Sequence, residues 1–232
     1  MALPLYLAMT AAEIQENAPL PTYFSYMACH FSPYGTGLSN LPPWLPKHTL
    51  LILNDRIPIH GHDPRRITNE LTALATEFMC SGILLDFQRE RCQEVLQLVT
   101  LAADMLPCPV AVPPAYASDC TCPVFLPPIP PDMAPEDYLR PWKGREIWLE
   151  VSLECLALTI TPSGCKTTPC SFPDNSKGIP CRKLYCHYQI ITEADQAKFI
   201  LFRTRNDLDR MLNTLQSLGI SRAVGLWQEL SE

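Results

Sequence analysis

Acidic side chains stand near the ends of two apolar segments of this sequence. Asp86 closes the run GILLDF, Gln88 follows two positions later, and Glu150 lies near the end of the run EIWLEV. Because side chains alternate along a strand, Asp86 and Gln88 lie on the same face. Two carboxyl groups roughly 5 to 9.5 Å apart are the usual catalytic pair for hydrolysing a glycosidic bond. The pattern therefore predicts Asp86 and Glu150 as candidate catalytic carboxylates, with Gln88 beside Asp86; the catalytic position of Gln88 itself follows from the resemblance described below.

Polar residues also follow the other apolar segments, and a polar group there is costly to bury unless it has a partner. Asp55 is a third carboxylate that could pair with Asp86, whereas Glu150 could instead form a structural ion pair with Arg89 or Arg56. Each polar residue could also simply be solvated or cap the next helix. We predict that the following residues contact a substrate: His30, Asn54, Asp55, Tyr116, Trp227, Gln228 and Glu229.

Four cysteines in the last third of the chain have an almost symmetric spacing. Cys165, Cys170, Cys181 and Cys186 are separated by steps of five, eleven and five. Four thiolates could bind zinc, but structural zinc sites usually place two residues, not four, between paired cysteines. We expect free thiols, no metal and no cofactor.

Apolar runs alternate with helical patterns along most of the chain, which is typical of a parallel sheet. Asp63-Pro64 marks one helix start, and Asn206 or Asp207 is expected to cap the last helix. Strands are expected near Leu5, Tyr26, Ile52, Leu84, Ala111, Phe125, Trp148 and Leu226. Eight such strands predict a (β/α)8 barrel. An open doubly wound sheet is the alternative, but no glycine-rich phosphate turn follows the first strand.

Proline is concentrated in one part of the chain. Eleven of the 24 prolines lie between Pro107 and Pro141, on either side of two short apolar runs, Val110–Val112 and Val124–Leu126. Proline cannot donate a hydrogen bond within a sheet, and here it flanks the runs without interrupting them. We expect two short strands with no helix between them, and hence a reduced barrel in which loops replace several helices.

The region 152–203 has a different pattern from the rest of the chain. Its apolar residues alternate with polar ones in Leu156–Thr161, Lys183–Ile191 and Lys198–Phe202. This alternation predicts a small antiparallel insertion between the penultimate strand and the last helix. The whole chain, 1–232, is expected to form a single barrel domain that carries this insertion.

The segment 81–88 resembles the fourth-strand motif of family 18 glycoside hydrolases, Asp-Gly-x-Asp-x-Asp-x-Glu. Gly82 and Asp86 match, whereas Ser81, Leu84 and Gln88 replace the two earlier aspartates and the glutamate. In that family the last aspartate orients the N-acetyl group of the substrate, and the glutamate protonates the leaving oxygen. The resemblance implies these positions for Asp86 and Gln88.

Other parts of the resemblance are mixed. Trp227 stands where the family has a tryptophan after the last strand, and Leu156–Phe202 stands where the family often inserts an antiparallel sheet. The family motifs of the third and sixth strands are absent. The resemblance implies a TIM barrel and an oligosaccharide or amino-sugar ligand.

Gln88 decides what activity the resemblance implies. A side-chain amide has no proton to donate near neutral pH, and general acid catalysis contributes about 100- to 10,000-fold in rate. We therefore expect carbohydrate binding with weak or no hydrolysis. Two alternatives remain: an active glycosidase that uses Asp86 with Glu150 or Asp55, and a non-catalytic scaffold or interaction protein.

Composition excludes several classes of partner. The formal net charge is −6 and the sequence pI is about 5.4, so the basic footprint of a nucleic-acid-binding protein is absent. No run reaches the roughly 18 apolar residues that span a bilayer. The first basic residue is Lys47, and the number of cysteines is odd, at 11. We expect a reduced, cytoplasmic protein without a membrane or nucleic-acid partner.

Overall fold

Eight parallel strands form a nearly closed barrel in the computed structural model, which describes residues 3–17, 19–42, 44–173, 178–193 and 195–231. The described barrel strands are β1 (Leu5–Met9), β2 (Phe24–Phe31), β4 (Leu50–Asn54), β5 (Gly82–Asp86), β6 (Val110–Ala111), β7 (Val124–Leu126), β8 (Ile147–Glu150) and β14 (Ile220–Leu226). Their order is β6-β5-β4-β2-β1-β14-β8-β7, and the short β3 (Leu38–Ser39) pairs with β2. A parallel bridge between Val112 and Val124 joins the two ends of the sheet.

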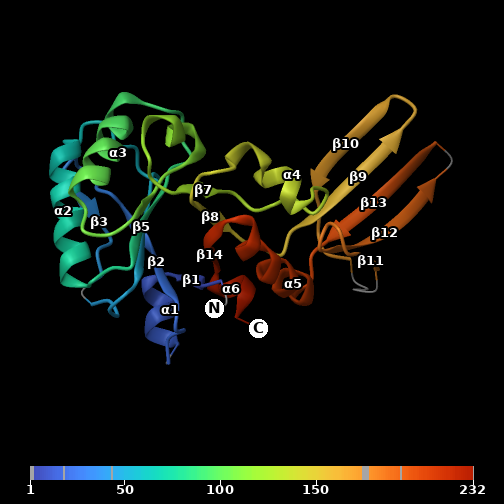
Figure 1. Cartoon of the computed structure of the whole chain (residues 1–232), viewed down its shortest axis with the longest axis horizontal. Coiled ribbons are helices and arrows are strands. Elements are labelled where there is room, and N and C mark those ends of the chain that lie inside the picture. The colour runs from blue at the N-terminus through green and yellow to red at the C-terminus, as the bar shows by residue number, and fades with distance from the viewer. Residues whose placement is uncertain (1–2, 18, 43, 174–177, 194, 232) are drawn as a thin grey trace.

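The helices of the barrel are few, as predicted from the proline-rich sequence. The described α-helices are α1 (Ala11–Glu16), α2 (Pro64–Glu77), α3 (Gln93–Met105), α4 (Pro135–Leu139), α5 (Arg205–Leu215) and α6 (Trp227–Leu230), with 3-10 helices at Pro114–Asp119, Arg140–Trp142 and Gln216–Leu218. α2 and α3 cover one side of the barrel (Figure 1). No described helix is long and apolar enough to cross a lipid bilayer.

Local sequence signals explain where these helices begin. Asp63 caps α2 by accepting a hydrogen bond from the Arg65 main-chain N–H, and Pro64 occupies the first turn. α5 begins earlier than predicted, because Thr204, not Asn206 or Asp207, is its N-cap. Asp207 is instead the third helical residue and completes a capping box with Thr204.

The connection between β6 and β7 differs from the prediction. We expected no helix there, but Pro114–Asp119 forms a 3-10 helix. Pro113 is the extended N-cap residue, with φ −61° and ψ 155°, and a proline follows it in the first turn, where its fixed φ suits a helix. A 3-10 turn also needs few residues. The reduced barrel is otherwise confirmed.

Large side chains fill the barrel interior near the amino-terminal ends of the strands. Trp148 is fully buried there, and the Arg222 guanidinium lies 4.3 Å from its ring centroid. A Cβ atom at Gly82 would approach the Trp148 ring to 2.6 Å. Glycine is therefore required on β5 by the packing of the tryptophan beside it. This packing closes the barrel beneath the cavity described below.

The predicted antiparallel insertion is present and projects from one end of the barrel (Figure 1). Its described strands are β9 (Cys155–Thr161), β10 (Gly164–Pro169), β11 (Ile179–Cys181), β12 (Cys186–Glu193) and β13 (Gln196–Phe202). They pair in the order β10-β9-β13-β12-β11. α5 then returns the chain to β14, the last strand of the barrel.

Candidate functional site

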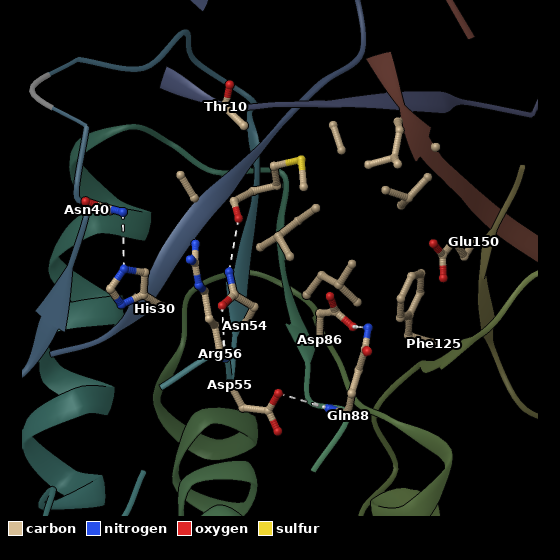
Figure 2. Close-up of a pocket in the computed structure, with 18 residues that line it drawn as sticks. Thr10, His30, Asn40, Asn54, Asp55, Arg56, Asp86, Gln88, Phe125 and Glu150 are labelled. Atoms are coloured by element: carbon tan, nitrogen blue, oxygen red, sulfur yellow. Dashed lines mark hydrogen bonds between the residues drawn. The ribbon is translucent and has the colours of Figure 1, made fainter. Parts of the chain in front are cut away.

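A cavity of about 420 Å³ lies at the carboxyl ends of the barrel strands (Figure 2). His30 comes from β2, Asn54 from β4, Asp86 from β5 and Glu150 from β8. Function in TIM barrels is located at this end, because the strand ends and their loops converge there. The apolar part of the lining consists of Ala8, Met27, Ala28, Ile52, Leu84, Phe125, Val224 and Leu226.

Asp86 and Gln88 lie side by side in this cavity. The Gln88 Nε2 amide donates a hydrogen bond of 3.3 Å to Asp86 Oδ1. Burial raises the pKa of Asp86, the hydrogen bond from Gln88 lowers it, and the negative charge of Asp55 raises it; the net shift is upward. The pair therefore presents one free carboxylate oxygen and one neutral amide. Because an amide has no ionisable proton near neutral pH, Gln88 cannot act as a general acid.

Glu150 projects from the opposite wall of the cavity (Figure 2). Burial, together with the charges of Asp86, Glu154 and Glu229, raises the pKa of Glu150 to about 7. Its carboxylate forms no ion pair with a described residue. The alternative pairing with Arg89 does not form, because that guanidinium donates to the main-chain carbonyls of Asp55 and Arg56, at 2.8 and 3.0 Å.

Asp55 lines the cavity but its carboxylate is already occupied. The side chain is buried, with 8% of its surface exposed. Oδ1 accepts the main-chain N–H of Gln88 at 3.1 Å, and Oδ2 accepts that of Arg89 at 2.8 Å. These bonds hold the loop after β5 against the end of β4. Asp55 therefore positions Gln88 and is not a free second carboxylate.

His30 and Asn54 are held by hydrogen bonds to the main chain. The register between β2 and β4 shifts between Tyr26 and Cys29. The Asn54 Nδ2 amide donates to the carbonyls of Met27 and Cys29, at 3.1 and 3.0 Å, and so satisfies this irregularity. The Nδ1–H of His30 donates to the Phe31 carbonyl at 2.7 Å, which leaves Nε2 as the acceptor for the Asn40 amide at 3.2 Å.

Four of the predicted substrate contacts lie outside the lining of this cavity. Tyr116 lines a neighbouring cavity of about 550 Å³, where its hydroxyl oxygen accepts the Cys92 main-chain N–H. Trp227, Gln228 and Glu229 are in α6. Trp227 packs against the outer core and Gln228 is exposed.

The reason is that β14 ends before Trp227. Leu226 is the last strand residue, and the chain turns into α6 at once. The Glu229 carboxylate accepts the main-chain N–H of Leu153 and so joins α6 to the start of the insertion. The lining instead uses Val224, Gly225 and Leu226 of the strand itself.

Thr10, Asn40 and Phe125 line the cavity and were not predicted as site residues. Thr10 directly follows β1 but reads as a helix cap, which it also is. Asn40 has a left-handed backbone, φ 54°, in a loop whose path no short sequence pattern reveals. Phe125 belongs to a short apolar strand, and such a run predicts a core residue.

The four-cysteine arrangement considered from the spacing does not form. Cys170 lies beside Cys155, with 3.1 Å between the sulfur atoms, and the Cys186 thiol donates to the Pro131 carbonyl. No group of three or more metal-binding side chains is found among the described residues. The spacing was misleading because β10 and β11 occupy opposite edges of the insertion sheet.

Comparison with solved structures identifies the fold. A class V chitinase from Nicotiana tobaccum, a glutamate-to-glutamine mutant in complex with NAG4, matches with a TM-score of 0.59 and 10% identity over 97% of this chain and 93% of that one. A family GH18 chitinase from Cycas revoluta in complex with allosamidin matches with a TM-score of 0.57 and 12% identity over 97% and 94%. The spore cortex-lytic enzyme SleL from Bacillus megaterium matches with a TM-score of 0.55 and 13% identity over 97% and 70%.

No protein-family model matches the chain, and no curated protein sequence does. The likeness therefore rests on the arrangement of the strands and the insertion. It agrees with the resemblance found around Asp86 in the sequence. The chain has the fold of the family 18 glycoside hydrolases, a chitinase-like TIM barrel.

Proposed function

We propose that this protein binds an oligosaccharide in the barrel cavity and hydrolyses it weakly or not at all. The observation that carries the proposal is the amide of Gln88 beside the Asp86 carboxylate, at the position where the resembling family has its acid. Binding needs only the shaped, partly apolar cavity and a few oriented polar groups. Hydrolysis also needs a proton for the leaving oxygen.

The Asp86 carboxylate is the group best placed to orient a ligand. One oxygen is shared with the Gln88 amide, which leaves the other to accept an N–H or O–H from a sugar. The Phe125 ring and the aliphatic lining supply the apolar surface on which a pyranose face packs. Because the class V chitinase structure with this fold holds NAG4, we take an N-acetylglucosamine oligomer as the first ligand to test.

The direct test is a calorimetric titration with (GlcNAc)4. We expect saturable binding by the wild-type protein and a loss of about tenfold or more in affinity in Asp86→Ala, because a hydrogen bond to a charged group is lost. Asp104→Ala, which changes a carboxylate in α3 outside the cavity lining, is the matched control. Absence of affinity for every neutral and acidic oligosaccharide tested would overturn the proposal and favour a scaffold role.

A second candidate is an active glycosidase in which Glu150 is the acid. The pKa of about 7 means that a large fraction of Glu150 is protonated near neutral pH, as a general acid requires. Asp86 would then act as the partner carboxylate. Turnover of an aryl glycoside that is lost in both Glu150→Gln and Asp86→Asn would establish this reaction.

The proposal also keeps the cytoplasmic setting inferred from the cysteines. Ten of the 11 cysteines are buried or partly buried, all 11 are free thiols in the structure, and the total is odd. A thiol count on freshly isolated protein tests this setting. We expect all cysteines to react with a thiol reagent after denaturation.

A further inference from the structure

One arginine that lines the barrel cavity has no acidic partner among the residues that the structure describes. Among the described lining residues, Arg56 is the only lysine or arginine. Figure 2 shows its side chain between His30 and Asn54. Its main-chain N–H donates to Asn54 Oδ1, whereas no described group accepts a hydrogen bond from its guanidinium.

Arg56 differs from the arginines that form ion pairs on the protein surface, and it differs from the other unpaired arginines in that it lines the barrel cavity. Guanidinium groups elsewhere lie within ion-pair distance of a carboxylate in the pairs Arg66–Glu70, Arg91–Asp119, Arg140–Asp137, Arg205–Asp209 and Arg210–Asp207. The carboxylate next to Arg56 in the chain, Asp55, is unavailable to it. Both Asp55 oxygens accept main-chain N–H groups of the loop after β5.

The polar side chains around Arg56 are also committed to the protein. The Asn54 amide donates to two carbonyls of β2, and the His30 Nδ1–H donates to the Phe31 carbonyl. A ligand that reaches this part of the cavity therefore meets one strong free donor, the guanidinium fork. Such a fork binds a carboxylate with two parallel hydrogen bonds.

The opposite side of the cavity has the opposite character. Glu150 of β8 lies there, and the charges that act on it are all negative. Figure 2 places Arg56 and Glu150 at opposite sides of the cavity. An anionic group of a bound ligand is therefore favoured at the Arg56 side and repelled at the Glu150 side, so one orientation of the ligand is selected.

We propose that the natural ligand is an acidic oligosaccharide, with a sugar carboxylate bound by Arg56. This inference rests on the proposed function, because it places an anionic sugar in the same cavity. It adds a specificity that the neutral N-acetylglucosamine oligomer lacks.

The test compares two sugars that differ only in charge. One probe is the disaccharide GlcNAc-MurNAc, which has a lactyl carboxylate, and the other is its carboxamide, with (GlcNAc)4 as the neutral reference. We expect calorimetry at low salt to show about tenfold tighter binding of the acid than of the carboxamide. In Arg56→Gln the two affinities should become equal, and Arg56→Lys should retain part of the difference.

Arg65→Gln is the matched control, because Arg65 is an arginine of α2 outside this cavity and without a carboxylate partner among the described residues. The Arg65→Gln variant should prefer the acid over the carboxamide by the same factor as wild type. Binding of (GlcNAc)4 without a preference for the carboxylate, or a preference that survives in Arg56→Gln, would overturn this inference alone. Absence of binding to all three sugars would overturn the proposed function as well.

Discussion

Two carboxylates of this protein have pKa values that are shifted in opposite directions. Asp207, at the junction of the insertion and the barrel, is fully buried, yet its pKa is lowered. Glu150, in the barrel cavity, is less buried, yet its pKa is raised to about 7. Burial raises the pKa of both groups, so the difference comes from their partners.

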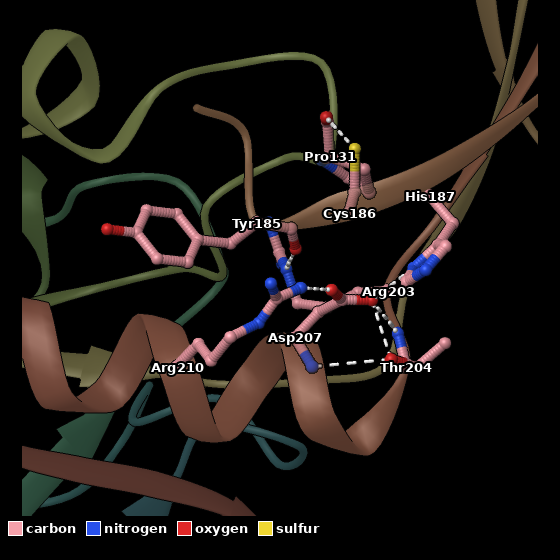
Figure 3. A network of polar contacts seen from close by, with 8 residues as sticks. All are labelled: Pro131, Tyr185, Cys186, His187, Arg203, Thr204, Asp207 and Arg210. Carbon is pink, nitrogen blue, oxygen red and sulfur yellow. Dashed lines mark hydrogen bonds and ion pairs between the residues drawn. The ribbon is translucent and has the colours of Figure 1, made fainter. Parts of the chain in front are cut away.

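Asp207 is surrounded by donors (Figure 3). Its Oδ2 accepts the main-chain N–H and the hydroxyl of Thr204, at 3.0 and 2.6 Å, and the Nδ1–H of His187 at 2.7 Å. Its Oδ1 accepts a bond from the Arg210 guanidinium. These donors stabilise the ionised form and outweigh the cost of burial.

Glu150 has negative neighbours and no such donor in the part of the chain that the structure describes. A carboxylate that serves only the fold is normally satisfied, as Asp207 is, because leaving it unpaired costs stability. Perturbed and unsatisfied groups that face a cavity are typical of sites that await a ligand. The contrast agrees with our proposal that Asp207 serves the fold and that Glu150 serves a ligand, and the following changes test it.

Asp207→Ala should have the largest effect on stability. It removes an acceptor from four donors and leaves the capping box of α5 incomplete, so the free energy of unfolding should fall by about 3 kcal/mol. Urea unfolding measures the change. Asp209→Ala, two residues along the same helix and half-exposed, should cost roughly 0.5 kcal/mol or less. Equal losses in the two variants would show that Asp207 is not a structural centre.

Asp55→Ala should have the next largest effect. The main-chain N–H groups of Gln88 and Arg89 lose their acceptor, so we expect a loss of about 2 kcal/mol. Oligosaccharide binding should weaken as well, because Gln88 is no longer held in place. Asp86→Ala is the variant to compare with it, because Asp86→Ala should weaken binding with little loss of stability. A large loss of stability in Asp86→Ala and none in Asp55→Ala would reverse our assignment of the two roles.

Glu150→Gln should have a smaller effect that depends on pH. The pKa of Glu150 is raised from its ordinary value of 4.5 to about 7, so the folded state holds this proton more tightly than the unfolded state does. The stability that the protonated group contributes is complete below pH 4.5 and is lost as pH rises through 7. Glutamine mimics the protonated form, so the variant should be more stable than wild type at pH 8, by on the order of 1 to 2 kcal/mol, and equal to it at pH 4. Thermal unfolding at the two pH values checks this, and a gain that is the same at both would exclude the ionisation of Glu150 as its cause.

Much of the site could be predicted from strand periodicity. Asp86 and Gln88 share a face because side chains alternate along a strand, and His30, Asn54 and Glu150 end strands that meet in the barrel. Tyr116 and Trp227 lie outside the lining of the cavity because the chain forms a helix shortly after β6 and directly after β14. The helical turn at each position directs the side chain of Tyr116 or Trp227 away from the cavity.

The role of Asp55 could not be predicted, because it depends on hydrogen bonds to residues 33 and 34 positions later. Asn40 is likewise brought into the cavity by a loop, where its amide meets His30. Contacts of this kind follow from barrel closure and leave no local pattern. The unpaired state of Arg56 is also visible only once its neighbours are known to be committed elsewhere.

The most direct test of the central claim is to compare wild type with Gln88→Glu on (GlcNAc)4, with mass spectrometry of the products. Wild type should bind the tetramer and leave it intact. Gln88→Glu should restore an ionisable acid beside Asp86 and release shorter oligomers at least about 100-fold faster than wild type. Equal product formation by the two proteins would contradict the claim that Gln88 separates binding from hydrolysis in this barrel.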